Sequence, residues 1–114
     1  MDIRAADEED RDRARRALMC DRYALRERAQ SEFSRHFGQN AAVEDVVRAL
    51  HRHLDSGGEM GVEEHEPTST ARTDRIFRVL FQCRGRVVFS HFYLLPHDSI
   101  ANCSIVFESL HPSN

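Results

Sequence analysis

The stretch that decides the fold runs from Arg75 to Leu95 and reads RIFRVLFQCRGRVVFSHFYLL. Apolar residues alternate on both sides of a central Arg-Gly-Arg, which is typical of two β-strands joined by a tight turn. We therefore predict strands over 74–83 and 86–95. One face of the first strand is a continuous apolar row of Phe77, Val79, Phe81 and Cys83. Ile76 and Leu80 make the opposite face apolar as well, whereas a face exposed to solvent would carry polar residues there.

Gly85 decides how the two strands pair. A two-residue turn of type I′ or II′ fits the twist of a hairpin and needs such a glycine. In that register the apolar row continues through Val88, Ser90, Phe92 and Leu94. A three-residue loop is the alternative, and it would place on that face Val87, Phe89, His91, Tyr93 and Leu95. We favour the two-residue turn.

The favoured register leaves the second face of the sheet apolar too. Its apolar residues are Ile76, Leu80, Val87, Phe89, Tyr93, Leu95, Ile100, Val106 and Leu110. Monomers seldom expose an apolar patch larger than a few hundred Å². Either two helices cover opposite faces, or both cover one face and a second copy of the chain covers the other. We favour the second copy and predict a homo-oligomer, with a dimer as the preferred state. The predicted interface residues are Ile76, Leu80, Val87, Phe89, Tyr93, Leu95 and Val106.

Two helices are expected before the strands. Residues 7–36 read as one long helix with an acidic first turn, which suits the helix dipole. Residues 40–56 read as a second helix, capped by Asn40 and ended by Gly57. Its apolar residues lie at helical spacing and predict a core-facing stripe of Val43, Val46, Val47, Leu50 and Leu54.

Two further strands complete the expected fold. One is a short edge strand that begins near Glu59, with Met60 and Val62 directed inward, and the other covers 100–110. The fold class is therefore α+β, with two N-terminal helices packed on a four-stranded antiparallel meander.

Length and composition indicate one domain over residues 1–114, with residues 1–6 expected to be flexible. The chain is 40% hydrophobic and 31% charged, which is ordinary for a globular protein. We expect no membrane association, because no uncharged stretch approaches the ~20 residues of a membrane span. The acidic start does not resemble a signal peptide, and three cysteines without a CxxC pair suit a reducing compartment. We expect a cytoplasmic protein, or a nuclear one in a eukaryotic host.

All sixteen basic residues are arginine, which suits a GC-rich bacterial, phage or viral genome. Arg15, Arg22 and Arg26 lie on the predicted 7–36 helix, and we expect them to bind a partner protein through their planar guanidinium groups. Nucleic acid is the weaker alternative. The net charge of −3 and the pI near 6.1 are not those of a basic nucleic-acid-binding domain.

Catalytic and metal-binding signatures are lacking in the sequence. No P-loop, GxSxG or HExxH pattern occurs. Glu63 and His65 supply two metal ligands at most, and His51 and His53 point apart on a helix. We therefore predict no metal and no cofactor.

The prediction that follows is a small, non-enzymatic, self-associating protein-interaction module, an accessory or regulatory protein. The alternative is a small α+β barrel enzyme or ligand-binding protein that uses His91, His97 and Asp98 for acid–base chemistry.

Overall fold

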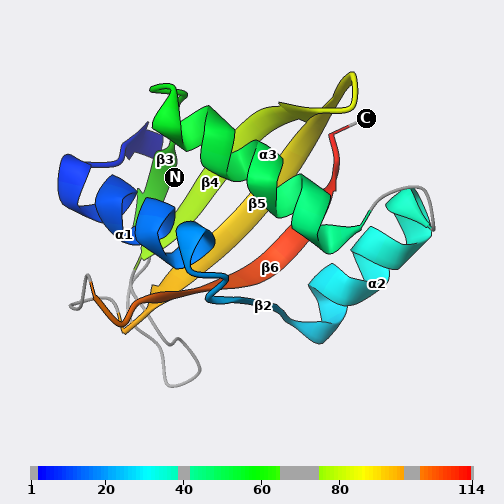
Figure 1. Cartoon of the computed structure of the whole chain (residues 1–114), viewed down its shortest axis with the longest axis horizontal. Helices are drawn as coiled ribbons and strands as arrows, with labels where there is room; N and C mark the ends of the chain where they lie inside the picture. Colours follow the sequence, from blue (N-terminus) through cyan, green and yellow to red (C-terminus); the bar gives the residue numbers. More distant parts are fainter. Residues whose placement is uncertain (1–2, 39–41, 65–74, 97–100, 114) are drawn as a thin grey trace.

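The computed structural model describes residues 3–38, 42–64, 75–96 and 101–113, and these form an α+β fold (Figure 1). Within them, three helices accompany a mixed six-stranded sheet of order β1-β3-β4-β5-β6-β2. The elements in chain order are β1 (Ile3–Ala5), α1 (Glu8–Met19), β2 (Tyr23–Leu25), α2 (Glu27–Phe37), α3 (Val43–Asp55), β3 (Gly61–Glu64), β4 (Arg75–Cys83), β5 (Arg86–Leu95) and β6 (Ser104–Pro112).

The predicted antiparallel meander is present as β3, β4, β5 and β6. Two short strands extend it, and neither was predicted. β1 pairs with β3 in antiparallel fashion, within a segment that was expected to be flexible. β2 pairs in parallel with β6 at the other end of the sheet. The edge strand expected near Glu59 is therefore an inner strand, although Met60 and Val62 do point into the core, at 2% and 0% exposure.

The hairpin between β4 and β5 has the predicted two-residue turn. Cys83 pairs with Arg86, and both intervening residues have positive φ angles, 53° at Arg84 and 78° at Gly85. Two positive φ values define a type I′ turn. The register follows from it, so Phe77 lies opposite Phe92 on the buried face.

The single long helix predicted over 7–36 is wrong. α1 ends at Met19, and Asp21 turns the chain with a φ of 56°. The amides of Asp21 and Arg22 donate to the carbonyls of Leu18 and Ala17, which is the hydrogen-bond pattern of a Schellman motif. Asp tolerates the left-handed conformation better than most residues do. The chain then enters β2 before it begins α2.

α3 matches the second predicted helix closely. Val46, Val47, Leu50 and Leu54 are all at most 4% exposed, and Val43 packs against the same core. The helix ends in a second Schellman motif, in which the amide of Gly58 donates to the carbonyl of His53 over 2.8 Å. Asn40, the predicted cap, lies outside the described residues, and Ala42 occupies the N-cap position without a side-chain hydrogen bond.

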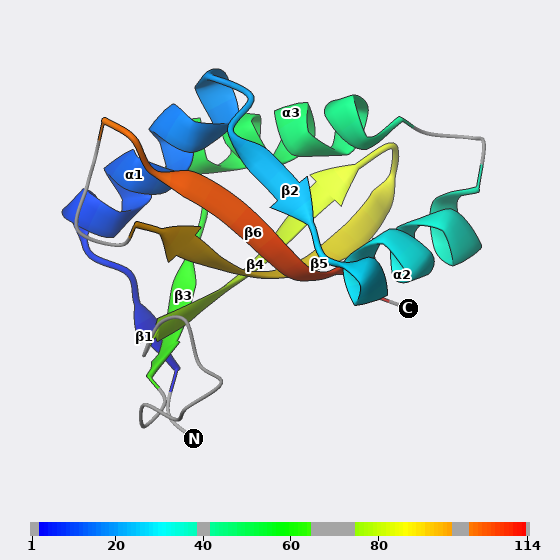
Figure 2. The same ribbon diagram turned by 90° about the horizontal axis from the view of Figure 1, so that it is seen from below.

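α1 and α3 lie on the same face of the sheet, and α2 lies beside β6 past the end of β2 (Figures 1 and 2). The core fills the space between these helices and the sheet. Its largest fully buried side chains include Phe92, Phe107, Leu50, Leu54 and Ile105. Ser90 lies in the same buried row, where its hydroxyl donates to the carbonyl of Val79 over 2.9 Å. The Ser90 hydroxyl therefore has a hydrogen-bond partner within the core.

β6 contains an irregularity that changes which residues face the core. His91 pairs with Ser109 and Phe92 with Phe107, so Glu108 is an extra residue in β6. A bulge of this kind shifts the alternation of every residue beyond it. Leu110 consequently pairs with Ser90 and is fully buried, so its predicted place on the second face is wrong. β6 also begins at Ser104, later than predicted, and Ile100 lies outside the described residues.

Candidate functional site

The face of the sheet directed away from α1 and α3 is the candidate site, and we call it the open face. No helix or strand among the described residues lies across it, and α2 only borders it at β6 (Figure 2). Leu80 in β4 has 54% of its surface exposed. Its cross-strand partner on β5 is the half-buried Phe89. All seven predicted interface residues lie in the rows that form this face, namely Ile76, Leu80, Val87, Phe89, Tyr93, Leu95 and Val106.

An ion-pair cluster borders the apolar centre on one side. Arg78 Nη1 lies 3.1 Å from Glu63 Oε1, and Glu63 Oε2 lies 3.6 Å from His91 Nε2. The Arg78 guanidinium also lies over the Phe89 ring, 5.4 Å from its centroid. The arginine is therefore held by a carboxylate and an aromatic ring at once, and its charge is compensated within the face.

A second group of polar side chains joins β6 to α2. His111 Nε2 lies 3.6 Å from Glu32 Oε2, and the His111 ring is 5.3 Å from Phe89 and 5.9 Å from His36. The other oxygen of Glu32 is buried and accepts no hydrogen bond from any described residue. Phe89 thus connects both histidine–glutamate pairs, since its ring is also 5.8 Å from that of His91.

Tyr93 is the exception among the predicted interface residues, because only 4% of its surface is exposed. Arg26 Nη1 donates to its hydroxyl over 3.4 Å and also lies 3.3 Å from Glu108 Oε1. Glu108 is the extra residue of the β6 bulge, so the bulge supplies the partner for Arg26. The sequence contains no clear signal for this contact, since Arg26 and Glu108 are far apart in the chain.

The three predicted partner-binding arginines do not share one helix. Arg15 lies in α1 and pairs with Asp12 and with Glu8. Arg22 follows α1 and donates to the carbonyl of Ala101. Arg26 precedes α2 at the border of the open face. Each of them has a partner within the chain, and their role in binding another molecule stays a prediction.

The alternative acid–base site is not assembled by the described residues. His91 lies on the open face beside Glu63, and His97 and Asp98 lie outside the described residues. In the described part of the chain, no group of three or more His, Cys, Asp or Glu residues is arranged to hold a metal ion.

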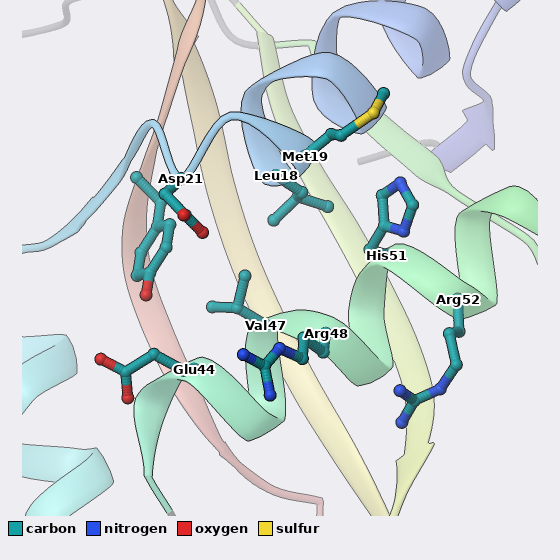
Figure 3. A pocket seen from close by; sticks show the side chains of 9 residues that line it. Leu18, Met19, Asp21, Glu44, Val47, Arg48, His51 and Arg52 are labelled. Carbon is teal, nitrogen blue, oxygen red and sulfur yellow. The ribbon is translucent and has the colours of Figure 1, made fainter.

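A groove lies on the other side of the molecule, between the end of α1, β2 and α3 (Figure 3). It has a volume of ≈ 610 Å³. Met19 projects at its rim with 67% of its surface exposed, and Leu18 and Val47 provide apolar walls. Its charged side chains are Asp21, Glu44, Arg48 and Arg52. Sequence reasoning did not find this groove, because it exists only where the predicted long helix is broken.

Comparison with protein-family models, with curated proteins and with solved structures finds no match for this chain. None of the helices in the described ranges is long and apolar enough to cross a membrane.

Proposed function

We propose that this protein is a self-associating interaction module, and that its open face binds a second copy of the chain. The single observation that carries this proposal is the position of Leu80. It is a large apolar side chain with 54% exposure on β4, an inner strand of the sheet, and no described element covers it. Inner strands are usually the best-covered part of a sheet, so the exposure of Leu80 favours a missing layer.

The charges of the open face favour a second copy as that layer. Two of its carboxylates are compensated by arginines on the face itself, Glu63 by Arg78 and Glu108 by Arg26. A face with internally paired charges and an apolar centre meets its own copy without strong repulsion. A two-fold axis through the Leu80–Phe89 pair places like apolar surfaces in contact, as in the isologous interfaces of most homodimers.

The physical gain is burial of apolar surface. Face-to-face sheets pack about 10 Å apart and interdigitate their side chains. Complete burial of a leucine or phenylalanine is worth about 1.5–3 kcal/mol. In a symmetric dimer each copy contributes its own Leu80 and its own Phe89, so the interface would bury two side chains of each kind.

The test is the molar mass in solution, measured by light scattering during size-exclusion chromatography over a hundredfold range of concentration. We expect about twice 13.2 kDa for the unmodified chain. Leu80→Arg introduces a charge at the centre of the interface, so we expect this variant to be monomeric with an unchanged circular dichroism spectrum.

Met19→Arg is the matched control, because it makes the same chemical change at the other exposed large hydrophobic residue of the described chain. We expect it to remain dimeric. A monomeric unmodified protein would contradict self-association. A dimer that survives Leu80→Arg would show that the interface lies elsewhere.

A further inference from the structure

Glu32 of α2 is a carboxylate at the border of the open face, and no arginine among the described residues pairs with it. Its ion-pair partner is His111 of β6, whose Nε2 lies 3.6 Å from Glu32 Oε2. His111 is the direct partner of Phe89 on β5, and Phe89 is the direct partner of Leu80 on β4. The rings of His111 and Phe89 are 5.3 Å apart, at the border where α2 lies beside β6 (Figure 2). A second copy seated on Leu80 and Phe89 therefore also covers the Glu32–His111 pair.

The contacts of His111 show which of its ring nitrogens gains or loses a proton. Nδ1 lies 2.7 Å from the carbonyl oxygen of Pro112. A carbonyl oxygen only accepts hydrogen bonds, so Nδ1 is the donor and carries a proton. In the neutral imidazole, Nε2 then has no proton and presents a lone pair to Glu32. Only the imidazolium places an N–H group and a positive charge opposite this carboxylate.

Glu32 has no other group that offsets its charge as directly. Its side chain is 20% exposed, and Oε1 is buried without a hydrogen bond from any described residue. In the single chain, water still reaches the pair, because the His111 side chain is 28% exposed. A second copy on the open face removes this water. Burial of a carboxylate without a cation is costly, so association favours the state in which His111 is charged.

His36 also faces this pair, and we call Glu32, His36 and His111 the acid–histidine cluster. His36 lies one turn after Glu32 in α2, and its ring is 5.9 Å from the ring of His111. Two imidazolium rings this close repel each other, so a proton on one disfavours a proton on the other. The three side chains therefore titrate together, and one proton per chain compensates the one carboxylate. Arg28 and Arg35 are exposed on the same helix and form no ion pair with it.

His91, the other histidine of the open face, shares its carboxylate with an arginine. Glu63 Oε2 lies 3.6 Å from His91 Nε2, and Glu63 Oε1 lies 3.1 Å from Arg78 Nη1. Because arginine keeps its proton, Arg78 compensates Glu63 whether or not His91 is charged. Arg86, at the start of β5, lies over the Phe37 ring of α2, 6.0 Å from its centroid. The cluster is therefore the place on this face where a carboxylate depends on a histidine proton.

We propose that self-association through the open face is coupled to proton uptake by the acid–histidine cluster, so that acidification strengthens the dimer. This inference rests on the proposed function and supplies its regulation. Histidine is the side chain whose charge changes between about pH 5 and pH 8. At the acidic end of this range the cluster of the free chain already holds its proton, and association is strongest. As the pH rises the free chain loses that proton, association must restore it, and the dissociation constant rises.

The test is the dissociation constant of the dimer, measured by sedimentation equilibrium at about pH 5.5 and about pH 8, where histidine is mostly charged and mostly neutral. The buffers have equal ionic strength, and each measurement is made with and without EDTA. Two clusters are buried in each symmetric dimer, so we expect the dissociation constant to be at least tenfold higher at the alkaline pH. EDTA should have no effect.

Glu32→Gln is the decisive variant, because it removes the carboxylate and keeps the shape of the side chain. At the alkaline pH we expect it to dimerise as tightly as the unmodified chain does at the acidic pH, with less than a threefold change between them. A variant that merely loses its fold cannot gain affinity in this way. Glu44→Gln is the matched control, since it makes the same change at an exposed position of α3, on the other side of the sheet. It should keep the tenfold dependence, as should His91→Gln.

Four results would overturn the proposal, and they have different meanings. A dimer with equal affinity at both pH values would remove the coupling and leave self-association intact. Loss of the pH dependence in His91→Gln but not in Glu32→Gln would assign the proton to the other histidine. Association that strengthens with rising pH and is abolished by EDTA would make the cluster a metal site, because metal ions bind deprotonated ligands. A chain that is monomeric at both pH values would refute the open-face dimer itself, and this regulation with it.

Discussion

The amide of Arg22 donates to the carbonyl of Ala17 over 2.7 Å, and this contact ends helix α1. It forms because Asp21, between them, adopts a left-handed backbone with a φ of 56°. Without this turn the chain would continue as a helix and would have no β2. The edge strand, the groove beside α3 and the separate course of α2 all depend on one residue that tolerates an unusual conformation.

Asp21→Gly is expected to stabilise the protein, because glycine adopts the left-handed conformation without steric strain. We expect the free energy of unfolding in urea to rise by about 0.5 kcal/mol. Asp21→Val is expected to lower it by about 1–2 kcal/mol, since a β-branched residue is strained there. Cys20→Gly is the control, because Cys20 has a φ of −96° and glycine should only destabilise it. Equal effects of both glycine substitutions would contradict this account.

The buried ion pair between Asp10 and Arg13 is expected to stabilise α1 against the sheet. Arg13 Nη1 lies 3.0 Å from Asp10 Oδ1, and the two side chains are 8% and 3% exposed. Arg13→Met leaves Asp10 buried without this cation, so we expect the free energy of unfolding to fall by about 3 kcal/mol.

Two comparisons identify the cause of that loss. The double variant Asp10→Leu and Arg13→Met should be more stable than Arg13→Met alone, because it also removes the buried carboxylate that has lost the Arg13 cation. Arg16→Met, at an exposed position of the same helix, should change stability by about 0.5 kcal/mol or less. Losses that simply add in the double variant would show that the two residues act independently.

Cys103 is expected to make stability fall at alkaline pH. Burial, with 1% of the residue exposed, raises the pKa of its thiol from its ordinary value of 9.0 to about 11. Above pH 9 the unfolded chain releases this proton while the folded chain retains it. The contribution of this thiol to stability is therefore complete below pH 9 and declines as the pH rises to 11, by about 2 kcal/mol. Urea unfolding at several pH values measures this, and Cys103→Ala should remove that part of the decline.

Thiol labelling gives an independent check on the same residue. Cys20 is exposed and Cys103 is buried, so Ellman's reagent should modify Cys20 in the folded protein and reach Cys103 only after unfolding. Rapid modification of all three thiols, which include the buried Cys83, in the folded chain would contradict the buried position of Cys103.

The strongly periodic parts of the fold were predictable from the sequence. The β4–β5 hairpin and its turn followed from one alternating pattern and the position of Gly85, and α3 followed from five apolar residues at helical spacing. These elements are specified locally, since the turn type sets the register and the stripe sets the buried face. The exposed Leu80 was predictable for the same reason, because it lies on the face opposite Phe77 and Val79.

The short strands β1 and β2 were not predictable in the same way. Each has three residues, too few to show a period of two, and each is stabilised by pairing with a distant strand. The bulge at Glu108 belongs to the same class. It has no local pattern, yet it moved Leu110 from the predicted open face into the core.

The sequence alone determined that a hairpin of known register carries apolar residues on both faces, and that α3 packs on a core. Only the tertiary structure decided that residues 7–36 divide into α1, β2 and α2, how α2 reaches β6, and which groups surround Phe89 and Tyr23. The physical reason is the range of the interactions. Periodicity and turn chemistry act between residues a few positions apart, whereas the contact of Arg26 with Glu108 and the pairing of β2 with β6 require segments that meet only after the chain has folded.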